Sequence, residues 1–290
     1  MTSRPYTCPY CAVELAHRPY AGKRDMPSSS TVANLVDDGK SRSFGWSAAG
    51  IAAVTAVHHP DDWTGLGTDD CTHDKTGFCP ACRYLRSEFD RQWTAKANLG
   101  THVHHLAQSW AEGVEVDVDA TCEPYMDAVE AFYHAADPEW VHLERTVLYD
   151  EPRSHAYRGQ FDGICVLNCP TCPDGPRCKW LIDWKSGGFY PSSQSLQLSS
   201  YRQARHLTRW VDGTETIDEP MPAVAHAGVI LLGADGGYQV VDLPTGGDTF
   251  GTFLRLRDVW AWNKTMAKWA REHPLEKITD LMTNDESVAA

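Results

Sequence analysis

The chain has 290 residues, 42% of them hydrophobic, with 39 acidic against 26 basic side chains and a formal net charge of -13. This length and composition suit a globular protein of one large or two small domains. The negative charge repels a polyanion at long range, so any nucleic-acid binding needs a local basic surface or bound cations. No apolar run approaches the roughly 20 residues that cross a bilayer, and no signal-peptide pattern opens the chain. We therefore expect a soluble, cytoplasmic protein with no membrane partner.

The first third of the chain is expected to be mainly helical. Residues 1–28 are polar, contain prolines and carry Cys8 and Cys11, so they are interpreted as an extension ahead of a main domain over 29–290. Apolar residues at helical spacing predict helices over 28–39, 85–110 and 124–137, the second broken at Gly100 and Thr101. Inserts into the main domain are predicted at 60–84 and 168–179.

The hydrophobic period changes to that of strands after the third helix. Strands are predicted over 140–150, 157–167 and 179–186, then a helix over 193–210, strands over 223–233 and 237–243, and a closing helix over 253–270. A helix that joins two strands of one sheet predicts a parallel pair with a crossover connection. The expected fold class is therefore α/β, with a mixed central sheet flanked by helices.

Two charged residues interrupt the apolar strand of "WLIDWKSGG". Strand side chains alternate between faces, so Asp183 and Lys185 point to the same side, together with Leu181. Isolated charges are rarely buried without partners, because their desolvation costs several kcal/mol. In the preceding strand Asp162 shares a face with Ile164, so an antiparallel hairpin would bring Asp162 close to Asp183.

Two converging carboxylates are the ligands that a hard divalent cation with open water positions needs. Mg²⁺ or Mn²⁺ held there would polarise a phosphate and lower the pKa of a bound water, while Lys185 could orient that water or stabilise developing charge. Glu144, in "HLERTV", could add a third carboxylate. A buried structural ion pair between Asp183 and Lys185 is the alternative on these residues alone.

Four motifs in order, "GTHVHHLAQSW", "GQFDGI", "LIDWKSG" and "QLSSYRQA", resemble the RecB-like branch of the PD-(D/E)XK nuclease superfamily. Within that branch, the chain is most similar to the CRISPR-associated exonuclease type often carried by actinobacterial phages. The resemblance covers roughly residues 27–270. It implies a restriction-endonuclease-like core and a metal-dependent DNA exonuclease of phage recombination, repair or DNA processing, acting in the host cytoplasm.

The resemblance also implies a set of site residues: one histidine, two acidic metal ligands, a catalytic lysine and a Q-x-x-x-Y pair. They fall on His104, Asp162, Asp183, Lys185, Gln197 and Tyr201. His102 and His105 are alternatives to His104. Because Gln197 and Tyr201 are four residues apart, they share one helical face, where they could hold the lysine or contact DNA.

The ten cysteines include three C-x-x-C pairs, which without a signal peptide favour metal binding over disulfides. Members of this branch with an iron–sulfur cluster take three cysteines from after the Q-x-x-x-Y motif, whereas here no cysteine follows Cys178. Structural zinc with sulfur and nitrogen ligands is therefore favoured over such a cluster. The grouping stays open, and Cys165 is an uncertain fourth ligand for the last group. The candidate zinc ligands are Cys8, Cys11, Cys71, His73, Cys79, Cys82, Cys169, Cys172 and Cys178.

Arg202, Arg205 and Arg209 lie at helical spacing in the helix predicted over 193–210 and would form a basic stripe. Such a stripe is either a solvated face or a contact to DNA phosphates. Two alternatives to an exonuclease remain: a structure-specific endonuclease, and a catalytically inactive, zinc-stabilised module that binds DNA or protein. The cysteine segments could also dock recombination or replication proteins.

Overall fold

The computed structural model describes residues 26–36, 40–66, 79–169, 172, 177–211 and 214–273. The predicted extension over 1–28 therefore lies almost wholly outside the described residues. Cys8, Cys11, Cys71 and His73 also lie outside them. The boundaries of the predicted main domain and its inserts stay predictions.

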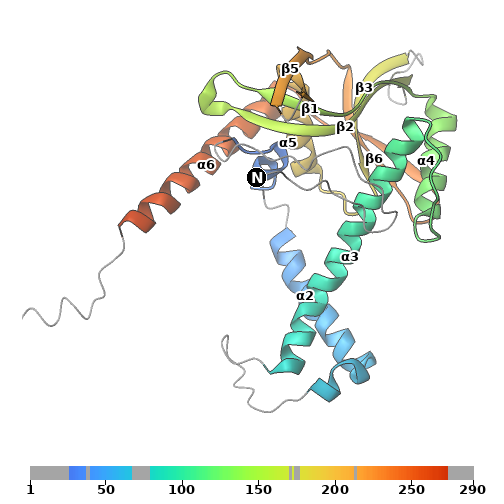
Figure 1. Cartoon of the computed structure of the whole chain (residues 1–290), viewed down its shortest axis with the longest axis vertical. Coiled ribbons are helices and arrows are strands. Elements are labelled where there is room, and N and C mark those ends of the chain that lie inside the picture. The colour runs from blue at the N-terminus through green and yellow to red at the C-terminus, as the bar shows by residue number, and fades with distance from the viewer. Residues whose placement is uncertain are drawn as a thin grey trace, which may run out of the picture.

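A seven-stranded mixed sheet forms the centre of the fold, with the strand order β5-β4-β1-β2-β3-β6-β7 (Figure 1). Every paired neighbour is antiparallel except β3 and β6, which are parallel. The α/β class, the mixed sheet and the parallel pair are thus confirmed. The strands are β1 (Glu139–Tyr149), β2 (Tyr157–Asn168), β3 (Arg177–Lys185), β4 (His206–Val211), β5 (Thr214–Pro220), β6 (His226–Leu232) and β7 (Tyr238–Asp242).

Helices cover both faces of the sheet. Trp180, Ile182 and Trp184 of β3 join one core cluster with residues of α3 (Pro80–Ala111) and α4 (Glu123–Ala136). Leu181 joins the opposite cluster, which contains Leu198 of α5 (Pro191–Arg202). The alternation of faces predicted for β3 is therefore confirmed. α1 (Ser29–Ala33) and α6 (Gly247–Glu272) pack beside α5 through a third cluster.

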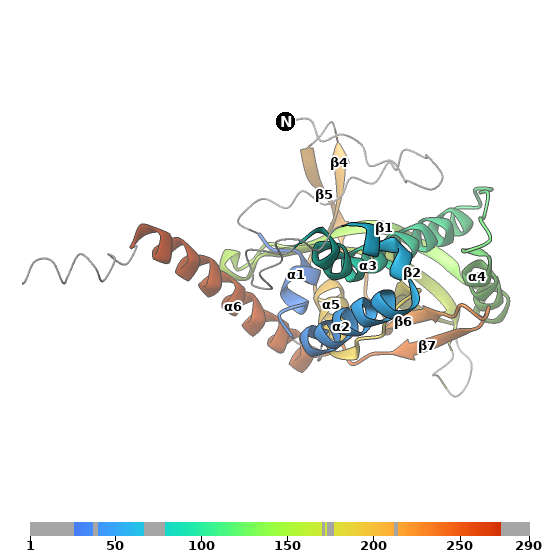
Figure 2. The same cartoon turned by 90° about the horizontal axis from the view of Figure 1, so that it is seen from below.

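Two long helical segments extend beyond the sheet. α2 (Lys40–His58) pairs with the N-terminal half of α3 to form an arm, and the end of α6 projects on another side (Figures 1 and 2). Three short 3-10 helices, Pro60–Asp62, Thr64–Leu66 and Arg153–His155, complete the described elements. No helix in the part of the chain that the structure describes combines the length and the apolar character that a bilayer crossing requires.

The helix break predicted at Gly100 and Thr101 is wrong, because α3 runs continuously over 32 residues. A glycine inside a helix costs about 1 kcal/mol relative to alanine and is tolerated where packing compensates. The Thr101 hydroxyl donates to the carbonyl of Ala97, so this side chain is accommodated within the helix.

The helix predicted over 193–210 is wrong in its second half. α5 ends at Arg202, and the chain enters β4 at His206, which pairs with β1 on one side and β5 on the other. The β4–β5 hairpin was not predicted. Its formation depends on pairing with β1, a contact between residues about 60 positions apart that local periodicity does not contain.

Candidate active site and metal centre

Asp183 and Lys185 lie at the end of β3 on the face that packs against α5. The Asp183 side chain is 6% exposed, and its carboxylate forms an ion pair with the Lys185 ammonium group. Burial disfavours charge on Lys185, but the carboxylates of Asp183 and Asp162 together raise the pKa of this lysine above its usual value. Lys185 is therefore a cation held between two acids.

Asp162 lies where β2 and β3 separate. The β2–β3 ladder ends at the pair Gly163 and Ile182, and one residue further Asp162 Oδ2 accepts a hydrogen bond of 2.7 Å from the backbone N–H of Trp184. Burial and the negative charge of Asp183 raise the pKa of Asp162, against the opposing effects of His104 and Lys185. The antiparallel hairpin does bring Asp162 and Asp183 together, as the spacing predicts.

His104 reaches the same place from α3, with its Nδ1 atom 3.3 Å from Asp162 Oδ2. His102, an alternative for this role, is buried and directs Nε2 toward Asp119 Oδ2 at 3.3 Å. The nitrogen of His102, a carboxylate oxygen of Asp119 and the sulfur of Cys122 lie within 4.8 Å of one another. Of these two histidines, His104 is thus the one that contacts Asp162.

Glu144 faces this group from β1. The pairing of Leu143 with Gly163 and of Arg145 with Phe161 places Glu144 opposite Asp162. Its backbone φ of 47° is a left-handed conformation inside a strand, and such outliers cost about 1–3 kcal/mol and cluster at functional sites. Burial, and next the charge of Asp162, raise the pKa of Glu144 to about 8. The Gln160 amide donates a hydrogen bond to the Glu144 carboxylate.

Gln197 and Tyr201 of α5 border the site. Gln197 Nε2 donates a hydrogen bond of 2.7 Å to Tyr201 Oη, so the predicted sharing of one helical face is confirmed. Burial, followed by the charge of Asp183, raises the pKa of Tyr201. The hydroxyl is therefore neutral beside the acidic group and can act as a hydrogen-bond donor.

Gly159 on β2 is a residue that sequence reasoning missed. A Cβ atom at this position would collide with the ring of Tyr201 and approach Ser29 Oγ to 2.7 Å. The glycine thus leaves the space in which the Tyr201 ring lies against the sheet. Its place three residues before Asp162, in "GQFDGI", was the available signal.

A second group of side chains gathers at the turn of the β2–β3 hairpin. One ligand atom each of Cys169, Cys172, Cys178 and His226 lies within 4.8 Å of the others, so the group could hold a metal ion. The three cysteines were predicted to ligate a metal. His226 was missed, because it follows Cys178 by 48 residues and reaches the group only through the pairing of β6 with β3.

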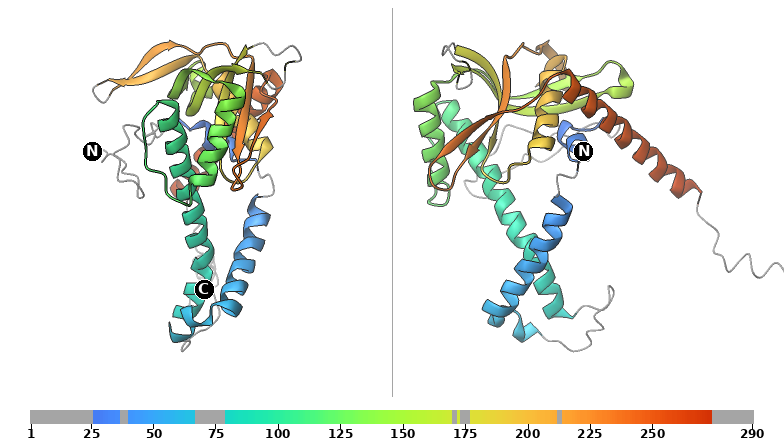
Figure 3. Two further views of the ribbon diagram at one scale, coloured as in Figure 1. Left: turned by 90° about the vertical axis from the view of Figure 1, so that its right-hand side faces the viewer. Right: turned by 180° about the vertical axis from the view of Figure 1, so that it is seen from behind.

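Cys79 and Cys82 lie apart from this group. Cys79 caps the N-terminus of α3 by accepting a hydrogen bond from the Cys82 backbone N–H, at the far tip of the α2–α3 arm (Figure 1). The end of β2 and the start of β3, next to the hairpin cysteines, lie in the sheet, far from this tip, so Cys79 and Cys82 are separate from the hairpin cysteines (Figures 1 and 3). A metal site built from Cys79, Cys82 and the undescribed Cys71 and His73 stays a prediction.

The basic stripe predicted for Arg202, Arg205 and Arg209 is wrong as a helical feature, because only Arg202 lies in α5. Arg202 donates to Thr245 and to the carbonyls of Val224 and Ala225. Arg205 forms an ion pair with Glu151, which follows β1, and Arg209 forms one with Asp218 of β5. A contact of these arginines with DNA stays a prediction.

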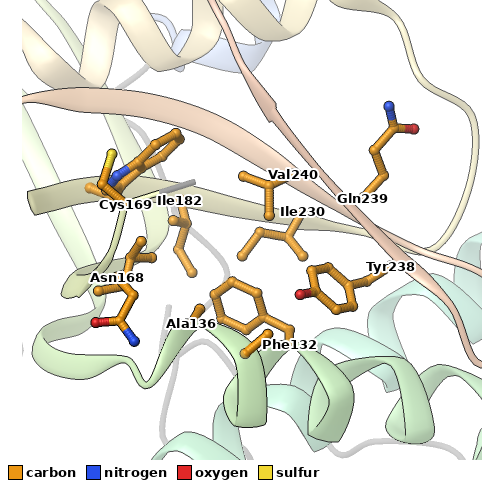
Figure 4. Close-up of a pocket in the computed structure, with 12 residues that line it drawn as sticks. Phe132, Ala136, Asn168, Cys169, Ile182, Ile230, Tyr238, Gln239 and Val240 are labelled. Atoms are coloured by element: carbon orange, nitrogen blue, oxygen red, sulfur yellow. The ribbon is translucent and has the colours of Figure 1, made fainter. Parts of the chain in front are cut away.

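An apolar pocket of about 560 Å³ lies between α4 and the sheet (Figure 4). Phe132, Ile182, Ile230, Tyr238 and Val240 line it, and Cys169 lies at its border. Because Ile182 points to the opposite face of β3 from Asp183, this pocket is separate from the acidic group.

In comparisons with known proteins, the chain matches no family model and no curated sequence.

Proposed function

We propose that this protein is a metal-dependent deoxyribonuclease of the PD-(D/E)XK superfamily, hydrolysing phosphodiester bonds at DNA ends as RecB-like exonucleases do. One observation carries the proposal: Asp162, Asp183, Lys185 and His104, from three separate elements, converge on one buried acidic site. From the sequence resemblance, we further propose a role in phage recombination, repair or DNA processing in the host cytoplasm. Recombination or replication proteins are the proposed partners.

The donor set suits a hard cation. Carboxylate oxygens and an imidazole nitrogen are ligands for Mg²⁺ and Mn²⁺. Burial, and after it the repulsion among the acids, raises the pKa values of Asp162 and Glu144, and a bound cation would offset both effects. His104, Asp162 and Asp183 would hold the ion, and Glu144 could add a carboxylate. When bound, the ion supplies Lewis-acid activation of a phosphate and a more acidic water.

The side chains of the chain itself have separate tasks in this proposal. Lys185, charged because its pKa is raised, can orient the attacking water or stabilise charge that develops on the phosphate. Asp183 holds that ammonium group in place through its ion pair. The neutral Tyr201 hydroxyl, fixed by Gln197, can donate a hydrogen bond toward substrate or toward the acids.

The presence of both acids and the lysine together argues against the inactive binding module, because a site without activity is free to lose any one of these residues. An endonuclease remains the second candidate, since the site chemistry is the same and access to it decides the substrate. For the cysteine group at the β2–β3 turn, we propose structural zinc.

The direct test is time-resolved digestion of end-labelled linear DNA and closed circular DNA with Mg²⁺ or Mn²⁺. We expect loss of the linear substrate only, and no loss with Asp183→Ala. Cutting of circular DNA that depends on Asp183 would replace the exonuclease by the endonuclease. Equal background with wild type and variant, in folded protein, would contradict the nuclease proposal.

A second expectation concerns cation binding without DNA. Mn²⁺ should raise the thermal midpoint of the wild type, because a ligand that binds only the folded state stabilises that state. At a free ligand concentration of 100 times Kd, the free energy of unfolding rises by about 2.7 kcal/mol. Burial and the charge of Asp162 disfavour ionisation of Glu144, and Glu144→Gln removes this buried carboxyl group, so the variant should be more stable than wild type without cation and gain less from Mn²⁺.

The matched control is Glu130→Gln, since Glu130 is an exposed glutamate of α4 that forms an ion pair with His134 of the same helix. Its midpoint and its Mn²⁺ shift should equal those of wild type. An unchanged Mn²⁺ shift in Glu144→Gln would remove Glu144 from the cation site.

A further inference from the structure

We propose that His226 completes a Cys3His zinc site with Cys169, Cys172 and Cys178, that Asp242 orients this histidine, and that the site fastens β6 to the β2–β3 hairpin. Zinc-binding cysteines at the hairpin are part of the function proposed above. The fourth ligand, its supporting carboxylate and the structural task of the site go beyond it.

The ligand atoms have the separations of a tetrahedral zinc site. With Zn–S near 2.3 Å and Zn–N near 2.0–2.1 Å, the edges of the tetrahedron are about 3.8 Å for S···S and about 3.6 Å for S···N. The Sγ atoms of Cys172 and Cys178 are 3.6 Å apart, and Cys172 Sγ is 3.5 Å from His226 Nε2. These atoms are therefore arranged so that one ion can contact all of them.

His226 is held in the orientation that a metal ligand requires. Its Nδ1 atom is 2.7 Å from Asp242 Oδ2, which leaves Nε2 directed toward the thiols. Histidine ligands commonly donate the second ring N–H to a carboxylate in this way, which fixes the tautomer. Trp180 stacks on the imidazole, with ring centroids 4.6 Å apart and an interplanar angle of 18°. The ring is thus restrained on one face and at one edge.

The arrangement indicates a structural task. Three thiolates and one imidazole fill all four zinc positions, whereas catalytic zinc keeps one position for water. Cys178 precedes Asp183 by five residues on β3, which corresponds to about 16 Å along a strand. Paired catalytic metals are about 3.5–4 Å apart, so this ion would not share in the chemistry at Asp183.

The ligands come from segments distant in the chain. Cys169 follows the last residue of β2, Cys178 is in β3, and His226 opens β6, where it pairs with Trp180. β6 and β3 are the parallel pair of the sheet, and parallel pairing is slightly less stable per residue than antiparallel pairing. A zinc ion at this end would connect β6 directly to the hairpin that carries Asp162 and Asp183.

The test measures zinc content, affinity by chelator competition and the visible spectrum of Co²⁺-substituted full-length protein. We expect the wild type to bind one zinc at this site with tetrahedral cobalt bands, and His226→Ala to lose one zinc per chain relative to the wild type, together with the cobalt bands of this site. Asp242→Asn should bind zinc about 10–100-fold more weakly without loss of stoichiometry, because it acts through the histidine. His226→Cys restores four ligands and should keep zinc, which separates ligand loss from misfolding.

His134→Ala, at an exposed histidine of α4, is the matched control and should equal wild type in affinity. Wild-type affinity and cobalt bands in His226→Ala would assign the fourth ligand to another residue and overturn the proposal. A brown protein containing iron and sulfide would overturn it as well. Asp183→Ala should keep full zinc affinity, so that failure of the nuclease and failure of this site give different results.

Discussion

Replacing Asp183 with asparagine is expected to reduce the rate of DNA hydrolysis by at least about 10³-fold, the scale on which preorganised electrostatic groups contribute to catalysis. Asparagine keeps the shape of the side chain but removes the negative charge. Two partners are affected together, the cation that the acidic site would bind and the Lys185 ammonium group that Asp183 holds. Steady-state cleavage of end-labelled DNA at saturating Mn²⁺ measures the effect.

Three comparisons separate this loss from misfolding. The Asp183→Asn variant should unfold close to the wild-type midpoint temperature, because Asp162 remains as an acidic partner of Lys185 and is relieved of the repulsion by Asp183. Asp127→Asn, on the exposed side of α4, should keep wild-type activity. Lys185→Gln should lose activity to a similar extent. If Asp183→Asn retained more than a tenth of wild-type activity, Asp183 would be a structural partner of Lys185 and the proposed site would be wrong.

Gly159→Ala is expected to destabilise the fold by about 3 kcal/mol, the upper part of the range for overpacking a close-packed interior. The added methyl group would collide with the ring of Tyr201 and press on Ser29. Neither neighbour can move freely. Tyr201, a residue of α5, has its ring buried in a core cluster, and Ser29 Oγ donates a hydrogen bond to the carbonyl of Arg158. Urea denaturation measures the change in the unfolding midpoint.

The matched control for this substitution is Gly251→Ala in α6, where a Cβ atom would meet nothing within 4 Å. This change should stabilise the protein by about 0.5–1 kcal/mol, because alanine has less conformational entropy to lose in a helix. DNA hydrolysis should fall in Gly159→Ala, whose methyl group displaces Tyr201, and stay unchanged in Gly251→Ala. A wild-type midpoint in Gly159→Ala would show that the tyrosine ring can move away.

Part of the site follows from short stretches of sequence. The period of two in β3 places Asp183 and Lys185 on one face, and the short connection between β2 and β3 makes their antiparallel pairing a local event. Asp162 therefore meets Asp183 as the spacing predicts. Helical spacing likewise brings Gln197 and Tyr201 together. The choice of His104 from three neighbouring histidines rested on the resemblance, because helical spacing alone does not say which face of α3 turns to the sheet.

Other features depend on contacts between distant segments. The end of α5 at Arg202 was missed because β4 is stabilised by strands β1 and β5 on either side, and this pairing overrides the helical spacing of the arginines. The left-handed backbone of Glu144 exists only because β2 holds β1 in register around it.

The composition and the local periods by themselves determined the α/β class, five of the seven strands (β1, β2, β3, β6 and β7), the acidic pair with its lysine, and the three hairpin cysteines as metal-ligand candidates. Only the tertiary structure decided that His226 joins those cysteines, that Asp242 supports it, and that Gly159 makes room for Tyr201. The physical reason is the range of the interactions. Alternation and helical spacing are set by the backbone within a few residues, whereas these contacts require the strands to be paired first.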